Sequence, residues 1–202
     1  VMLGTGYVGL VSGACFSEFG FEVTCIDSDI SKIKNLKKGI MPIYEPGLES
    51  LVKKNFASGK LKFVTLEKKI ISNADAIFIA VGTPERRGDG HADLTYVYEA
   101  VSQISKYLTN YTVIVTKSTV PVGTSEKIKE IIVSENSKAK FDVVSNPEFL
   151  REGSAIEDFM RPNRVIVGCE NERSKEVMAT IYKPLYLLDT PVLYTNLKTS
   201  EL

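Results

Sequence analysis

The residues with the clearest chemical meaning stand at the start of the chain, where Gly4, Gly6 and Gly9 form a G-x-G-x-x-G pattern. It follows an expected strand at Val1–Leu3 and precedes a helical stretch. In such a turn the first glycine permits a tight bend, the second lets the backbone approach a pyrophosphate, and the third lets helix and strand pack closely. The phosphates would lie on the N–H groups of the helix N-terminus. Alone the pattern is weak, because glycine-rich turns are common.

A carboxylate at a suitable spacing strengthens this interpretation. The next expected strand, Val23–Asp27, ends in Asp27, eighteen residues after Gly9. A carboxylate there accepts hydrogen bonds from the adenosine ribose and repels a 2′-phosphate, which favours NAD over NADP. The alternative is that Asp27 only ends a strand and caps the helical stretch Asp29–Lys37. Because motif, order and spacing agree, the sequence predicts dinucleotide binding.

Three further polar segments, residues 81–84, 116–123 and 145–153, follow expected strands. Ligands bind at the carboxyl ends of strands in open α/β sheets, so we expect these segments to form one site beside the glycine turn. Glu148 and Glu152 would share a face if their segment were a helical turn. Physical reasoning alone leaves open a catalytic role for these glutamates and a solvated acidic turn.

Short apolar runs alternate with amphipathic stretches along the chain. The remaining expected strands are Leu61–Thr65, Ala76–Val81, Thr112–Thr116, Asp142–Ser145, Arg164–Gly168 and Pro191–Tyr194. Helices are expected at Glu45–Phe56, with Pro46 in its first turn, at Thr95–Leu108, with Asp93 as a cap, and after a capping box at residues 154–157. This alternation predicts an α/β fold: a Rossmann-like, doubly wound, mainly parallel sheet with helices on both faces.

Composition limits the partners. Lysine plus arginine and aspartate plus glutamate each number 25, so the net charge is zero, which argues against nucleic acid and an anionic membrane surface. No apolar run predicts a membrane span and no signal peptide opens the chain. Three spaced cysteines and a single histidine, His91, exclude a multi-histidine metal site and a histidine-based triad, and we expect no metal. A cytoplasmic protein with reduced thiols is the simplest interpretation.

The chain ends suggest a part of a longer protein. The first expected strand has only three residues, and residues 199–202 read as the first turn of a helix. We therefore expect an NAD-binding domain over residues 1–195, with residues 196–202 beginning a central helix that leads to a substrate domain.

The segments GTGYVGL, VGTP, KSTVPVGT and NPEFLREGSAIEDF, followed by RPNRVIVG, resemble the N-terminal NAD-binding domain of the UDP-glucose/GDP-mannose dehydrogenase family. The resemblance covers nearly the whole chain, and KSTVPVGT is most similar to members that act on UDP-glucose. It implies oxidation of the sugar C6 alcohol to a carboxylate, giving UDP-glucuronate, with two NAD. In the family a cysteine thiolate carries the intermediate as a thioester, which water then hydrolyses.

The resemblance also implies roles for matching residues. Those that match pyrophosphate contacts are Gly4, Gly6, Tyr7, Val8 and Gly9. Those that match the adenosine end are Asp27 and Lys32. Those that match the nicotinamide side are Thr83, Ser118, Thr119 and Glu152. Glu148 matches a general base or water-orienting glutamate, and Thr119 matches a threonine that positions the catalytic water. The strip that would hold the nucleotide sugar consists of Glu148, Phe149, Leu150, Arg151 and Glu152.

The chain departs from the family in one respect, because the family's nucleophilic cysteine, a lysine and an asparagine lie beyond the segment that matches residues 199–202. Cys15, Cys25 and Cys169 fall outside the matching motifs, and we expect them to be structural. The chain is therefore expected to bind NAD without turnover. Alternatives are a dehydrogenase of GDP-mannose or UDP-N-acetyl-mannosamine, and a non-catalytic NAD sensor. Family members dimerise through the helix that follows, so a homodimer or higher oligomer is expected for the full-length protein.

Overall fold

A computed structural model of the chain describes residues 1–85 and 92–202, and His91 lies outside these ranges. Within them one sheet has the strand order β3-β2-β1-β4-β5-β6-β7-β8. The strands are β1 (Met2–Leu3), β2 (Val23–Ile26), β3 (Leu61–Val64), β4 (Ala76–Ile79), β5 (Thr112–Thr116), β6 (Phe141–Ser145), β7 (Val165–Gly168) and β8 (Val192–Thr195). Neighbouring strands are parallel except β6 and β7, which are antiparallel. The expected Rossmann-like fold is confirmed.

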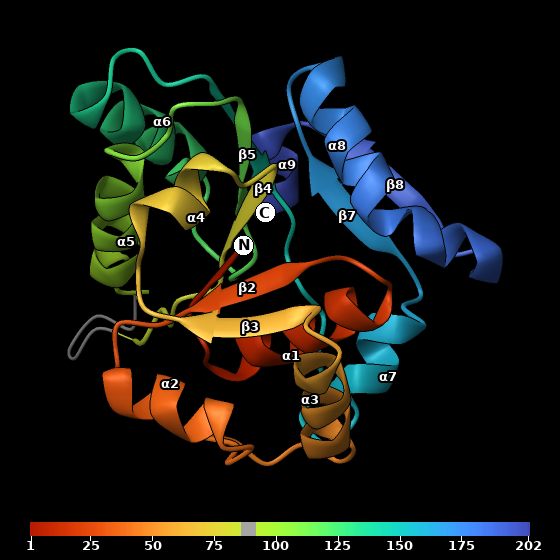
Figure 1. Ribbon diagram of the computed structural model, residues 1–202. Helices are drawn as coiled ribbons and strands as arrows, with labels where there is room; N and C mark the ends of the chain where they lie inside the picture. The colour runs from red at the N-terminus through yellow and green to blue at the C-terminus, as the bar shows by residue number, and fades with distance from the viewer. Residues whose placement is uncertain (86–91) are drawn as a thin grey trace.

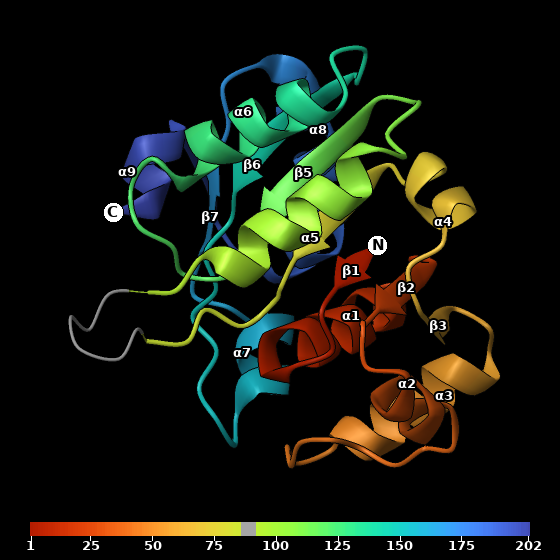
Figure 2. The ribbon, with the colours of Figure 1, turned by 90° about the vertical axis from the view of Figure 1, so that its left-hand side faces the viewer.

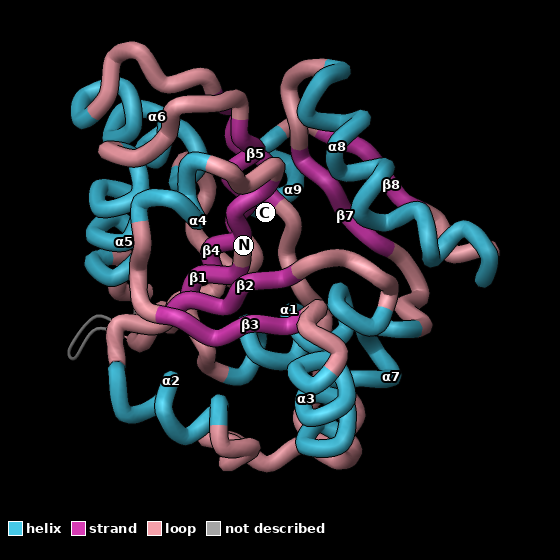
Figure 3. Tube along the Cα trace, viewed as in Figure 1, coloured by secondary structure: helices cyan, strands magenta, loops and turns pink. Residues whose placement is uncertain are grey.

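Helices cover both faces of the sheet (Figures 1 and 3). They are α1 (Tyr7–Glu18), α2 (Ile30–Lys37), α3 (Leu48–Ala57), α4 (Lys68–Ser72), α5 (Thr95–Ser105), α6 (Thr124–Glu135), α7 (Ala155–Met160), α8 (Glu172–Tyr182), the short 3-10 helix η1 (Lys183–Leu188) and α9 (Leu197–Glu201). In Figure 2, α5 and α6 lie over β5 and β6, whereas α1 and α7 lie lower in the view and belong to the core on the opposite face of the sheet.

Two apolar cores explain this layering. Successive strand residues point to opposite faces, so a strand that is apolar throughout is buried on both. In β5, Val113 and Val115 pack in the core that contains residues of α1, α3, α7 and α8. Ile114, between them, packs in the core that contains residues of α4, α5 and α6. The continuous apolar runs in the sequence are therefore a direct consequence of a sheet sandwiched by helices.

Each expected strand is present, with ends that move by at most two residues, but several helix starts differ. Helix α3 begins at Leu48, so Pro46 precedes its first turn. The last helix begins at Leu197, two residues before the expected first turn at 199–202, and its cap is Asn196, whose side chain accepts from Thr199 N at 2.8 Å. No helix among the described residues is long and apolar enough to cross a membrane.

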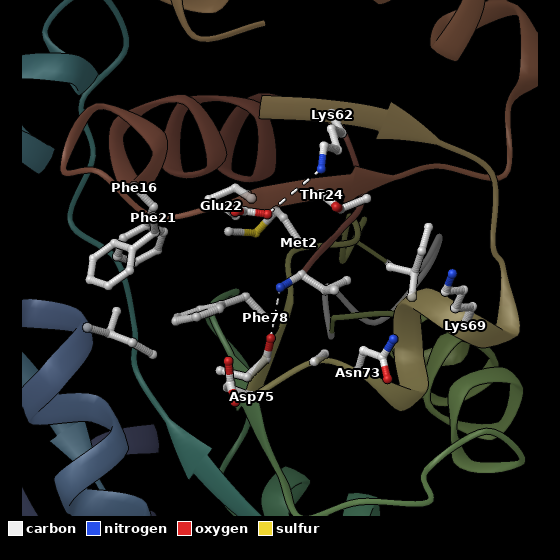
Figure 4. A pocket seen from close by; sticks show the side chains of 16 residues that line it. Met2, Phe16, Phe21, Glu22, Thr24, Lys62, Lys69, Asn73, Asp75 and Phe78 are labelled. Carbon is white, nitrogen blue, oxygen red and sulfur yellow. Dashed lines mark hydrogen bonds and ion pairs between the residues drawn. The ribbon is translucent and has the colours of Figure 1, made fainter. Parts of the chain in front are cut away.

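A cavity of about 540 Å³ lies where β1, β2 and β4 begin, at the edge of the sheet away from the glycine turn (Figure 4). Val1 lines this cavity, and its backbone nitrogen donates to Ala76 O at 2.8 Å. None of the predicted site residues lines this cavity.

Candidate functional site

The glycine turn joins β1 to α1 with the geometry that its three glycines predict. Gly4 has φ +96°, and a Cβ there would lie 2.6 Å from Ala80 O. A Cβ on Gly9 would lie 2.1 Å from Gly4 O, so the helix and the turn touch through this residue. A Cβ on Gly6 would meet no protein atom within 4 Å. Gly4 and Gly9 are thus required by the fold, whereas Gly6 faces open space at the start of α1.

Asp27 follows β2 and is held beside the turn. Its carboxylate accepts from Thr5 N at 2.9 Å, from Thr5 Oγ1 at 2.5 Å and from Asp29 N at 2.9 Å. Burial opposes its ionisation, but these hydrogen bonds and Lys32, whose Nζ lies 3.4 Å from Oδ2, lower its pKa. Asp27 is therefore a fixed anion at the end of β2, and the capping of α2 falls to Asp29.

A cavity of about 470 Å³ brings the turn and the first predicted loop together. Its lining includes Gly4, Thr5, Gly6, Asp27, Ser28, Lys32, Val81, Gly82 and Pro84, with Tyr96, Ala100 and Gln103 of α5 opposite. Tyr7, Val8 and Thr83 do not line it. The cavity is open, has Asp27 and Lys32 at its wall, and adjoins the N-terminus of α1, where N–H groups lack helical partners. These features fit a dinucleotide with its pyrophosphate at Gly6.

The second predicted loop is tied to the first and to the third. Ser118 Oγ donates to Val81 O at 3.0 Å. Asn146 N donates to Thr116 O at 2.9 Å, at the ends of β5 and β6. Thr119 is exposed and lines neither the cavity of about 470 Å³ nor the cavity of about 40 Å³ at Glu148. The structure thus places the three predicted loops side by side without joining all their residues in one cavity.

Lys117 is a residue that the motif analysis missed. It is 4% exposed, and its Nζ donates to Asn146 Oδ1 at 3.1 Å and to Tyr182 Oη at 3.3 Å. Tyr182 also donates to Asn146 Oδ1 at 2.5 Å. Burial lowers the pKa of Lys117 to about 8, partly offset by the Glu148 carboxylate nearby. A lysine within KSTVPVG was the only sequence signal, and nothing local shows that it is buried.

The strip from Glu148 to Glu152 is irregular and not helical, so the two glutamates do not share a helical face. The Glu148 carboxylate accepts from Leu150 N. Glu148, Phe149 and Leu150 line a smaller cavity of about 40 Å³ together with Lys117. Arg151 points elsewhere, because its guanidinium pairs with Asp158 at 2.7 Å, and Glu152 is exposed.

Glu45, which lies just before α3, is a second residue whose role the sequence analysis did not predict. The Tyr7 hydroxyl donates to its carboxylate, as do Gly153 N at 2.8 Å and Ala155 N at 2.9 Å. Ser154 makes no side-chain cap bond, so the predicted capping box is absent and Glu45 caps α7 instead. Gly153 and Ala155 lie 108 and 110 residues after Glu45 in the sequence, so no local pattern reveals these contacts.

The chemistry of the described residues has clear limits. Cys15 and Cys25 are buried, and desolvation raises the pKa of each thiol to about 12, so neither is a ready nucleophile. Desolvation also raises the pKa of the half-buried Cys169. In the described ranges no three His, Cys, Asp or Glu side chains form a metal-binding group. The site can therefore hold an anionic ligand on backbone N–H groups and present carboxylates beside it.

Comparison with known proteins matches this geometry. A profile of the UDP-glucose/GDP-mannose dehydrogenase family, NAD binding domain, matches residues 1–186. UDP-glucose 6-dehydrogenase of Rhizobium meliloti strain 1021 is 56% identical over 203 residues, covering 100% of this chain and 46% of that protein. UDP-glucose 6-dehydrogenase YwqF of Bacillus subtilis strain 168 is 46% identical, covering 100% and 45%. The chain thus spans about half the length of the curated relatives it matches.

Solved structures give the same result. The chain resembles a UDP-glucose dehydrogenase from Pyrobaculum islandicum with a TM-score of 0.92 and 39% identity, covering 98% of this chain and 46% of that one. It also resembles a GDP-mannose dehydrogenase from Pseudomonas aeruginosa with a TM-score of 0.92 and 33% identity, over the same shares of both chains.

Proposed function

Because the chain belongs to the UDP-glucose/GDP-mannose dehydrogenase family and matches its NAD-binding domain, we propose that it is the NAD-binding half of a UDP-glucose 6-dehydrogenase. The observation that carries the substrate assignment is 56% identity over the whole chain to an enzyme of that name. The glycine turn, the open space at Gly6 and the fixed Asp27 carboxylate support the cofactor assignment.

The residues that line the cavity of about 470 Å³ fit NAD. Gly6 and the N-terminus of α1 would hold the pyrophosphate, since Gly6 leaves space there. Asp27 would accept from the adenosine ribose with the lone pairs not used by Thr5 and Asp29, and Lys32 lies beside it. Bound there, NAD supplies a hydride acceptor for the alcohol carbon of the sugar.

Glu148 is proposed as the general base that activates water when the oxidised sugar is released, with Thr119 positioning that water. Its carboxylate follows β6 and is anchored by Leu150 N, next to the loop that carries Ser118 and Thr119. The strip from Phe149 to Glu152 would contact the nucleotide sugar. The thiol that forms the thioester would come from outside this chain, because Cys15 and Cys25 are buried and Cys169 lines neither the cavity of about 470 Å³ nor the one at Glu148.

Two measurements test the proposal. The 202-residue chain is titrated with NADH and followed by fluorescence; saturable binding is expected, and its absence would contradict the cofactor assignment. The product of the complete gene is then assayed for NADH formation with UDP-glucose, GDP-mannose and UDP-N-acetyl-mannosamine. Preferential oxidation of UDP-glucose is expected, whereas preference for another sugar would assign the chain to that branch of the family. NADH binding without oxidation of any of them would indicate a sensor.

The chain alone is expected to show no steady oxidation of UDP-glucose, since the curated relatives it matches are about twice as long. The assay is the absorbance rise of NADH in a mixture of the chain, UDP-glucose and NAD. Steady turnover would show that the active thiol lies within these residues, and Cys169, the most accessible of the three, would be replaced by serine first.

A further inference from the structure

The Glu45 side chain joins three segments that are distant in sequence. It is 5% exposed and accepts hydrogen bonds from the Tyr7 hydroxyl in α1 and from Gly153 N and Ala155 N at the start of α7. Tyr7 belongs to the glycine turn, and Gly153 lies near the end of the loop that runs from Asn146 to α7. One buried carboxylate therefore holds the proposed cofactor turn and the proposed substrate loop together.

The chemistry of this contact makes it sensitive to each partner. Burial opposes ionisation of Glu45, but the bonds from Tyr7, Gly153 and Ala155 outweigh it and lower its pKa. A buried carboxylate that loses a donor is left with an unsatisfied charge, which is far more costly than losing a surface hydrogen bond. The positions of Tyr7 and of the loop are therefore set jointly. Tyr7 also lies 3.4 Å from Arg151 O, a second point of contact with the same loop.

We propose that Glu45 is a positioning residue that couples occupation of the glycine turn to the ordering of residues 148–156. This inference rests on the proposed NAD site and adds a function for a residue outside it. A dinucleotide on the turn restricts the first residues of α1, so the Tyr7 hydroxyl stays on Glu45, and Glu45 keeps its bonds to Gly153 and Ala155. By thermodynamic reciprocity, a loop held in place also favours the cofactor.

Amide hydrogen exchange of the 202-residue chain, with and without NADH, tests the coupling. In the wild-type chain NADH is expected to slow exchange both at residues 6–9 and at Gly153 and Ala155. The Tyr7→Phe variant keeps the ring and loses the donor. In this variant NADH should still slow exchange at the turn. At Gly153 and Ala155 we expect NADH to slow exchange about tenfold in the wild type and only about twofold or less in Tyr7→Phe. In Glu45→Gln, which offers one acceptor oxygen in place of two, these amides should exchange faster even without NADH.

Tyr111→Phe is the matched control, because the Tyr111 hydroxyl donates to Asp142 at 2.5 Å, also a tyrosine–carboxylate contact, and neither residue lines the 470 Å³ cavity. Both effects of NADH should persist in it. The coupling is wrong if NADH slows exchange at the wild-type turn but not at Gly153 and Ala155, or if Tyr7→Phe responds like the wild type. No effect of NADH on the wild-type turn would overturn the cofactor assignment as well.

Discussion

At the scale of single residues, Asp27 is the group that should choose between NAD and NADP. Its carboxylate is 10% exposed and already bonded to Thr5, so it cannot turn away from a 2′-phosphate. Asp27→Ser is expected to weaken NADH binding by roughly 1–3 kcal/mol, because hydrogen bonds to a charged acceptor are lost. The substitution should also reduce the preference for NADH over NADPH. Fluorescence titration of the variant with both cofactors measures this.

Asp29→Ser is the control for this change. Asp29 caps α2 through Ser31 N and Lys32 N and does not line the cavity, and serine is also a good cap. NADH affinity should stay within about twofold of the wild type. Equal affinities of the wild-type chain for NADH and NADPH would contradict the role of Asp27.

Glu148→Gln, made in the product of the complete gene, tests the proposed base. General base catalysis typically contributes 10²–10⁴-fold, so turnover should fall by about that factor while NADH affinity is retained. Because the lost step is hydrolysis of the thioester, intact-protein mass spectrometry should reveal a covalent sugar adduct. The control is Glu157→Gln on the exposed side of α7, which should turn over normally. Slow turnover without an adduct would mean that another group activates the water.

The sequence predicts those site residues whose role follows from the spacing of residues that are close together in the chain. Gly4, Gly6 and Asp27 are predicted this way, because the distance along the chain from the glycine turn to the end of the next strand is nearly fixed. Lys117 and Glu45 are not, since their importance comes from burial against partners supplied by distant elements. A lysine in a polar motif and a glutamate before proline look solvated until the chain is folded.

At the scale of elements, the glycines of the turn have two different roles. Gly9 is required for folding, whereas Gly6 is proposed to be required for binding the ligand. Gly9→Ala would place a methyl group 2.1 Å from Gly4 O, so α1 must shift, and the chain should lose at least about 2 kcal/mol of stability. Gly6→Ala meets open space at a negative φ, so stability should change by less than about 1 kcal/mol, while NADH affinity falls at least tenfold. Thermal unfolding and NADH titration of both variants measure this. Normal NADH binding by Gly6→Ala would place the pyrophosphate elsewhere.

Strands were easier to predict than helix ends. An apolar run fixes a buried strand, whereas a helix start depends on whichever acceptor reaches its first N–H groups. Ser154 suggested a capping box, but a carboxylate from before α3 caps α7. Likewise Glu201 in α9 accepts from Gly123 N and Ser125 N, both at 2.7 Å, at the start of α6. Tertiary contacts supply these caps, so local sequence does not reveal them.

For the whole molecule, the cost of burying Lys117 should make stability depend on pH. Burial lowers its pKa to about 8, whereas an exposed lysine has a pKa of about 10.4. Between these values the unfolded chain holds a proton that the folded chain has lost, so the free energy of unfolding rises with pH. Below about pH 8 both states are charged, and the folded state bears the full cost of burial, about 3 kcal/mol.

Guanidinium unfolding of the wild type and of Lys117→Met at pH 7 and pH 9 measures this cost. The wild type should gain about 1 kcal/mol relative to the variant over this interval. The comparison is necessary because burial raises the pKa values of the Cys15 and Cys25 thiols to about 12, so these thiols lose their protons first in the unfolded chain and the fold loses stability as pH approaches and passes about 9. That effect is common to both proteins and cancels in the difference. Parallel pH profiles would mean that the Lys117 ammonium keeps its solvation in the folded chain, and that Asn146 and Tyr182 hold it at no electrostatic cost.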